Sequence, residues 1–177
     1  MIRNPKEPLN PNHGIIIRYG KIRHIFIVDT RKNLKDKALI AAISIIKQPR
    51  TNYFYIVQSS AKKGYGPILY ESAMEYIKPN YLAPSYDTNR FSSKIWRVFM
   101  ERKDICKKPY KGKIIKEFEK YIYTTRYKLP GYKNAIQMGK SWMRSQRKIT
   151  GWNNQRIFRT LTREGDKLFN QYRGKKV

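Results

Sequence analysis

A strand-like run, a basic glycine turn and a helix-like run follow one another between Tyr53 and Ile77. Tyr53–Ser59 is rich in aromatic and β-branched residues, which favours a strand. Two lysines then precede Gly64-Tyr65-Gly66, and Pro67 stands where a helix would have its first residue, a position that tolerates a missing amide. Apolar residues recur at helical spacing up to Pro79. This order predicts an α/β chain.

A glycine turn that opens a helix is suited to holding phosphate. Glycine allows close backbone approach and a positive φ, and the first helical turn leaves its amide donors unpaired. Lys62 and Lys63 add positive charge. The turn lacks both the Gly-Lys-Ser/Thr of a P-loop and the third glycine of a dinucleotide site. A tight strand-to-helix connection without a ligand would also account for it.

The first half of the chain reads as strands joined by short turns. Residues 1–12 form an irregular arm with three prolines, and 29–36 read as a loop or a short helical turn. Residues 38–46 fit either a buried strand or a helical face, and we favour the strand because it would form a hairpin with Tyr53–Ser59. The other predicted strands are 14–18 and 22–28, joined by a turn at 19–21.

The second half reads as mainly helical. The elements that we expect there are an extended piece at 81–84, a helix over 91–102 capped by Thr88-Asn89, a helix or strand over 114–127, and helices over 133–147 and 154–172. The last of these is amphipathic, with apolar residues along one side and arginines elsewhere.

The segment from Tyr53 to Tyr70 resembles the acyl-CoA-binding motif of GNAT N-acetyltransferases. In that family the fourth strand leads into an Arg/Gln-x-x-Gly-x-Gly/Ala loop and then a helix. More narrowly, the chain is similar to GNAT-like proteins of bacteriophages, on the residues Gly64-Tyr65-Gly66-Pro67, Leu69-Tyr70, Leu82-Ala83-Pro84, Ser92-Ser93 and Trp96. The resemblance covers about residues 38 to 105.

This resemblance implies a fold and a division of the chain. The expected fold is α/β: a GNAT-like mixed, mainly antiparallel twisted sheet flanked by helices, with a basic helical C-terminal extension. Residues 1–12 would be the arm, 13–105 the acyl-CoA-binding core, and 106–177 a basic, aromatic-rich part that completes the domain.

The resemblance also implies acetyl-CoA, or CoA, as cofactor. Its pyrophosphate would lie against Gly64, Tyr65 and Gly66 with help from Lys62 and Lys63, and its pantetheine arm would meet backbone groups of Val57 and Ser59. Two departures bear on catalysis. Ala61 stands where the family has Arg or Gln, and Trp96 and Phe99 occupy the positions nearest to the family's tyrosine acid. No glutamate lies in Tyr53–Ser60, so the proton would pass through water or Tyr55.

The chain carries a net charge of +27, which points to a polyanionic partner. The stretch from Arg102 to Val177 holds 22 basic and 5 acidic residues and interleaves them with aromatics. Aromatic faces stack on unpaired bases and cations neutralise phosphate, although most of these aromatics would also serve to close the core. We expect DNA or RNA to be bound through its backbone, at Arg126, Lys128, Lys133, Arg144, Arg147, Lys148, Arg156 and Arg159.

Three functions fit these features. The first is a phage-type N-acyltransferase that modifies an amine of a nucleic-acid-bound protein or of the nucleic acid. The second is a non-catalytic nucleic-acid-associated or virion protein of the same fold, in contact with other virion proteins. The third is a structural ribonucleoprotein subunit, which would explain the charge but not the loop. With one cysteine, two histidines and no apolar run long enough for a membrane span, we expect no disulfide, no metal site and a location in the cytoplasm of an infected cell or in the virion.

Overall fold

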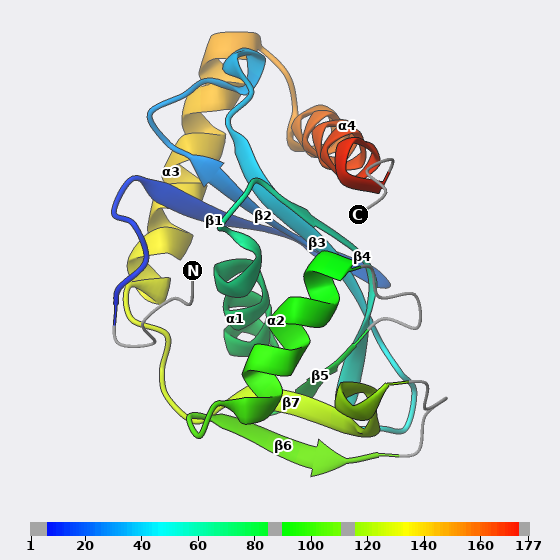
Figure 1. The fold of residues 1–177 in the computed structure, drawn as a ribbon. Coiled ribbons are helices and arrows are strands. Elements are labelled where there is room, and N and C mark those ends of the chain that lie inside the picture. Colours follow the sequence, from blue (N-terminus) through cyan, green and yellow to red (C-terminus); the bar gives the residue numbers. More distant parts are fainter. Residues whose placement is uncertain (1–6, 85–89, 111–115, 174–177) are drawn as a thin grey trace.

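One twisted, mixed sheet of seven strands organises the chain in the computed structural model, which describes residues 7–84, 90–110 and 116–173 (Figure 1). The strands are β1 (His13–Arg18), β2 (Ile22–Asp29), β3 (Leu39–Lys47), β4 (Tyr53–Ala61), β5 (Tyr81–Ala83), β6 (Ile105–Pro109) and β7 (Tyr121–Thr125). Their order across the sheet is β1-β2-β3-β4-β5-β7-β6. Every neighbouring pair is antiparallel except β4 and β5, which run parallel.

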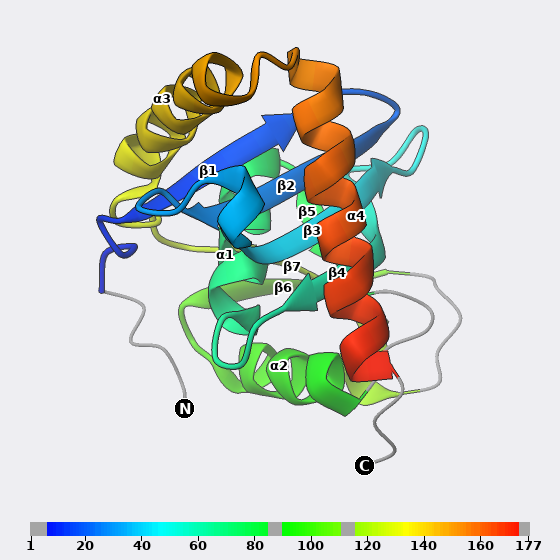
Figure 2. The ribbon, with the colours of Figure 1, turned by 90° about the horizontal axis from the view of Figure 1, so that it is seen from above.

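Helices cover both faces of this sheet. They are α1 (Gly66–Ile77), α2 (Arg90–Glu101), α3 (Tyr132–Thr150) and α4 (Asn154–Arg173), with short 3-10 turns η1 (Leu34–Asp36) and η2 (Glu117–Lys120). Helices α1 and α2 lie together on one face, α4 crosses the other face, and α3 runs along β1 at the edge (Figures 1 and 2). The chain is therefore α/β, with its only parallel strand pair among the described strands in the middle of the sheet.

The two faces of the sheet bury separate apolar layers. Successive side chains of a strand point to opposite faces, so on β2 Ile25 and Ile27 join the layer under α1 and α2. Phe26 and Val28 join the second layer, which includes Trp142 of α3. Burial of apolar side chains on both faces stabilises the middle of the sheet and fixes its register.

Helix α3 lies almost backbone to backbone against the edge strand β1. A Cβ atom built on Gly139 would stand 2.1 Å from the carbonyl oxygen of Ile15, and one on Gly14 would stand 2.9 Å from the amide nitrogen of Gly139. Only glycine allows this approach, because any side chain there would occupy the space of the strand backbone. The helix thereby covers an edge that would otherwise expose unpaired backbone groups.

Most predicted elements are confirmed, including the strand over 38–46, which is β3, and the short helical turn before it. Residues 114–127, left open as helix or strand, contain η2 and β7. Pro67 is the second residue of α1 and not the first. The expected Thr88-Asn89 cap lies outside the described residues.

One strand was missed by the sequence analysis. β6 reads Ile-Cys-Lys-Lys-Pro, which has the composition of a loop, and it forms a strand because β7 pairs with it along its whole length. The C-terminal part is therefore not only helical. It contributes β6 and β7 to the sheet, which continues beyond β5 through β7.

Acidification is expected to destabilise the fold through its two histidines. Burial lowers the pKa of His13 and of His24 below the usual 6.5, so the unfolded chain takes up protons first as the pH falls. The free energy of unfolding should decrease as the pH drops through about 6.5 and level off below the folded pKa values. Urea titrations between about pH 7.5 and pH 5 would measure this, and a His13→Gln/His24→Gln variant should show a flatter dependence. If the free energy of unfolding of the variant depends on pH as steeply as that of the unsubstituted protein, the two histidines are not the cause.

Candidate functional site

Strands β4 and β5 run side by side for only part of their length. Tyr53, Phe54 and Tyr55 pair with Tyr81–Ala83. Pro84 follows, and it has no amide to continue the ladder. Among the described strands, none pairs with Ile56–Ala61 on this side of β4. The backbone groups there need other partners, and a ligand can provide them.

A β-bulge lies where the two strands part. Ser44 of β3 is opposite Gln58, while the next residue, Ile45, is opposite Ile56, so Val57 has no partner in β3. The Val57 side chain is 48% exposed, which is high for a valine in an inner strand. Bulges redirect the backbone locally and are frequent next to binding sites.

The loop after β4 presents unpaired amides at the start of α1. The Lys62 amide donates to the Ile40 carbonyl (2.9 Å) and the Tyr65 amide to the Lys62 carbonyl (3.0 Å). The amides of Gly64, Gly66 and Ile68 meet no acceptor within the described part of the chain. Such donors, together with the positive end of the helix dipole, favour a bound anion.

Gly64 gives this loop both its shape and its accessibility. Its φ is +90°, a conformation that disfavours residues with a Cβ atom, and no heavy atom lies within 4 Å of where that Cβ would be. Lys63 beside it is exposed and Lys62 half-buried. The predicted cofactor residues Lys62 to Gly66 thus form one continuous basic loop whose open side faces solvent.

Helix α2 closes the other side of the opening. Ile95 touches the start of α1, because a Cβ on Gly66 would lie 2.5 Å from its Cδ1 atom. Deeper inside, Tyr70 stacks on Trp96 with ring centroids 5.2 Å apart. The Tyr70 hydroxyl lies 2.9 Å from the Ser59 hydroxyl. These contacts connect β4, α1 and α2 around the point where β4 leaves β5.

The sequence analysis did not identify the hydroxyl groups of Ser59, Tyr70 and Ser92 as one cluster. Burial raises the pKa of Tyr70, and hydrogen bonds with Ser59 and Ser92 counteract only part of this effect, so the phenol stays protonated. The expected role of the Ser59 backbone stays a prediction, and the Ser59 side chain points to Tyr70. The three residues come from β4, α1 and α2, and no local pattern links them.

Tyr55 lies toward the opposite end of β4 from the loop. It stands seven residues before Lys62, which corresponds to about 23 Å of extended strand, and it pairs with Ala83. Together with Lys21 and Arg23 it lines a separate hollow beside the β1–β2 turn. Its expected role as the proton-transfer group stays a prediction, since the structure brings it next to the bulge but not to the loop.

The predicted nucleic-acid residues fall into separate groups. Arg126, Lys128 and Lys133 are exposed around the start of α3, while Lys148, Arg156 and Arg159 are exposed around the α3–α4 connection, where Arg156 stacks on Trp152 at 4.0 Å. Arg144 and Arg147 lie on α3 at a groove between β1, α3 and α4. Tyr123 and Trp142 are core residues, as expected if most aromatics of this stretch close the core.

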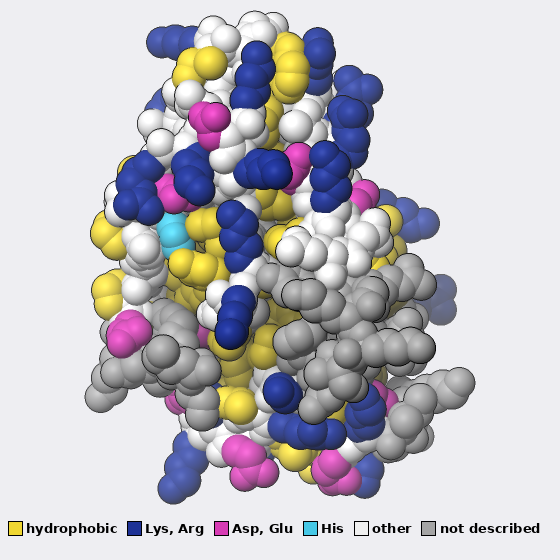
Figure 3. All heavy atoms as spheres, turned by 45° about the horizontal axis from the view of Figure 1, so that its top comes forward, with side chains coloured by type: hydrophobic (Ala, Val, Ile, Leu, Met, Phe, Trp, Pro, Cys, Tyr) yellow, Lys and Arg dark blue, Asp and Glu magenta, His cyan; other side chains and the backbone are white. Residues whose placement is uncertain are grey.

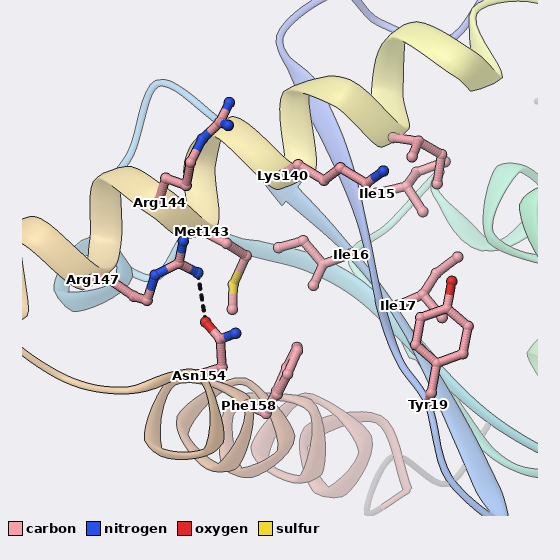
Figure 4. Close-up of a pocket in the computed structure, with 12 residues that line it drawn as sticks. Ile15, Ile16, Ile17, Tyr19, Lys140, Met143, Arg144, Arg147, Asn154 and Phe158 are labelled. Atoms are coloured by element: carbon pink, nitrogen blue, oxygen red, sulfur yellow. Dashed lines mark hydrogen bonds between the residues drawn. The ribbon is translucent and has the colours of Figure 1, made fainter.

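This groove encloses about 350 Å³ and is lined mainly by apolar side chains (Figure 4). Lys140 joins Arg144 and Arg147 along it. The sequence analysis missed Lys140, although its spacing of four and seven residues from the two arginines predicts a common helix face.

Searches for similar proteins gave no match to any protein-family model, any curated protein or any solved structure. Within residues 7–84, 90–110 and 116–173, no three potential metal ligands cluster and no helix is both long and apolar enough to cross a bilayer. Cys106 is a free, half-buried thiol.

Proposed function

We propose that the chain binds an acyl-CoA at the point where β4 and β5 part, and that it is an N-acyltransferase. The observation that carries this proposal is the combination, on one strand, of a bulge at Val57, an unpaired edge from Ile56 to Ala61, and a basic loop with free amides. The sheet, with its parallel pair at this point, is compatible with a GNAT-like fold.

The dimensions and chemistry of the donors fit such a cofactor. Val57 and Lys62 are five residues apart, so a ligand lying along β4 would span about 16 Å between bulge and loop. The amides of Gly64, Gly66 and Ile68 suit a pyrophosphate, and Lys62 and Lys63 suit its charge. The unpaired backbone of Ile56–Ala61 suits the amide groups of a pantetheine arm.

A bound acyl-CoA would supply an activated thioester carbonyl to an acceptor amine. The chain's own part would be to orient that carbonyl beside the bulge and to let the amine lose a proton. Carboxylates are absent from Tyr53–Ser60, so we propose that the amine's proton leaves through a water or the Tyr55 hydroxyl. As the amine's bond to the acyl carbon forms, the C–S bond breaks and the CoA thiolate leaves with a proton. The chain's net charge of +27 would attract it to nucleic acid and bring it close to an amine of a molecule that is bound there.

Replacing Gly64 with alanine is expected to weaken acetyl-CoA binding by about tenfold. The new Cβ would project into the open side of the loop, where the pyrophosphate has to approach, and the positive φ would be strained. Isothermal titration calorimetry of the nuclease-treated protein with acetyl-CoA measures the affinity directly.

Gly151 offers a matched control. Its φ is +71° and no heavy atom lies within 4 Å of its Cβ position, but it caps α3, far along the chain from the loop. Gly151→Ala should therefore cost similar stability, about 1–2 kcal/mol, and leave the affinity unchanged. If the unsubstituted protein binds no acetyl-CoA at millimolar concentration, the acyltransferase proposal fails and a non-catalytic role of the same fold takes its place.

A further inference from the structure

The groove between β1, α3 and α4 combines an apolar floor with a cationic rim. Ile16 of β1, Met143 of α3 and Phe158 of α4 form the floor, and α3 approaches β1 closely at Gly139. Ile17 lines the groove from the other side of β1 (Figure 4). Its volume of about 350 Å³ is at the lower end of the ~300–1,000 Å³ that is usual for sites of small organic ligands. A single flat group such as a nucleobase fits a hollow of this size.

Three cations of α3 line one side of the groove and have no acidic partner in the part of the chain that the structure describes. Lys140, Arg144 and Arg147 extend over seven residues of helix, which is about 10 Å. None of them forms an ion pair with any described residue, and no residue lining the groove is acidic. Arg147 donates to the side-chain oxygen of Asn154 (2.6 Å), a neutral group that leaves its charge uncompensated.

Uncompensated cations at this spacing place a strong positive potential along one wall. On the face that Figure 3 presents, Lys and Arg side chains surround apolar surface, with some Asp and Glu side chains between them. Like charges this close repel one another and reduce stability, so they favour an anionic partner that lies across them.

Two aromatic rings line the groove, one on each side of β1 (Figure 4). Tyr19, at the end of β1, is 74% exposed, which is unusual for so large a side chain. Phe158 is half-buried, and its ring stacks on Phe26 with centroids 6.5 Å apart. The guanidinium of Arg18 lies 5.7 Å from the Phe158 ring. Exposed aromatic faces next to cations are the usual means of binding unpaired bases.

We propose that this groove is a binding site for single-stranded nucleic acid. The phosphates lie along Lys140, Arg144 and Arg147, one base enters the hollow over Ile16, Met143 and Phe158, and a neighbouring base stacks on Tyr19 beyond the edge of β1. A duplex would present only its sugar-phosphate backbone to the rim and leave the apolar floor without a partner, because its bases are stacked inside. The site is thus specific for unpaired strands and tolerant of sequence, since every base has a face that can stack.

The test uses the full chain, freed of bound nucleic acid, and a fluorescein-labelled oligothymidylate of about 12 nucleotides, within the ~4–16-nucleotide range of single-strand sites. Fluorescence anisotropy at several salt concentrations gives the affinity and its salt slope. Lys140→Gln/Arg144→Gln should lower the slope by about 1.4, because each phosphate contact with a single strand contributes about 0.7. Tyr19→Ala should lower the affinity about fivefold or more through lost stacking, with little effect on the slope.

A control variant separates the groove from the general charge of the surface. Lys94→Gln/Lys103→Gln removes the same number of exposed cations from α2 and the turn after it, away from the groove. It should change the slope by far less than the groove variant. Three results would each overturn the proposal. The two double variants could change the slope equally, or the Tyr19→Ala protein could bind as tightly as the unsubstituted one. A duplex of equal length could also bind as tightly as the single strand.

Discussion

Replacing Arg102 with methionine is expected to lower the free energy of unfolding by about 3–5 kcal/mol. Arg102 follows α2, and its guanidinium donates to Asp104 (2.6 Å) and to Glu71 (3.3 Å). Glu71 lies on α1 with no exposed surface, and it also accepts a hydrogen bond from the Tyr127 hydroxyl. Without the arginine the buried carboxylate would lose its cation, which is the costly way to break a buried pair.

Urea denaturation would measure this loss, and a thermal scan should give a Tm about 10 °C lower for a chain of this size. Arg31→Met provides the matched control. Arg31 also donates to an aspartate two residues away, Asp29 (3.0 Å), but its side chain is 64% exposed. Exposed pairs of this kind contribute only about 0–1 kcal/mol.

A double variant tests the cause. In Arg102→Met/Glu71→Gln the buried charge is gone, so a large part of the stability should return. If the double variant is as unstable as the sum of the two single variants, the loss comes from packing around α2 and not from the buried charge.

The sequence predicts the elements whose signal is local. Ile-rich β1 and β2 with a glycine turn between them, and α1 with its proline and apolar spacing, are examples. β6 is not of this kind: its residues Lys107, Lys108 and Pro109 favour a loop, and pairing with β7 overrides this preference. The buried hydrogen-bonded cluster of Glu71, Arg102 and Tyr127 was also missed, because these residues are 25 to 56 positions apart and no local pattern links them.

The two candidate sites differ in how far they could be read from the sequence. The basic loop at Gly64 is a contiguous segment, so its residues could be named in advance. The groove is assembled from Tyr19, directly after β1, and Lys140 on α3, more than a hundred residues apart. Only the packing of α3 on the edge strand brings them together. Charge composition indicated a polyanion, but it could not show that the cations surround an apolar hollow.

That packing makes Gly139 a position at which one methyl group should matter. We expect Gly139→Ala to lower the free energy of unfolding by about 3 kcal/mol, at the upper end of overpacking effects. A Cβ there would be 2.1 Å from the Ile15 carbonyl oxygen, a backbone atom that cannot rotate away. The helix would have to move off β1, and Trp142, on its next turn, would lose contact with the core.

Gly165 of α4 is the comparison that isolates this effect. It also lies inside a helix and faces the sheet, but its Cβ would meet side-chain atoms and no backbone: the Ala42 methyl group at 3.2 Å and the Leu39 Cδ2 at 3.8 Å. Alanine gains up to about 1 kcal/mol over glycine in a helix, so Gly165→Ala should stay within about 1 kcal/mol of the unsubstituted protein. Equal urea midpoints for the two variants would show that α3 adjusts freely. A Gly139→Ala protein that remains folded but binds oligothymidylate poorly would show that the seating of α3 on β1 also sets the shape of the groove.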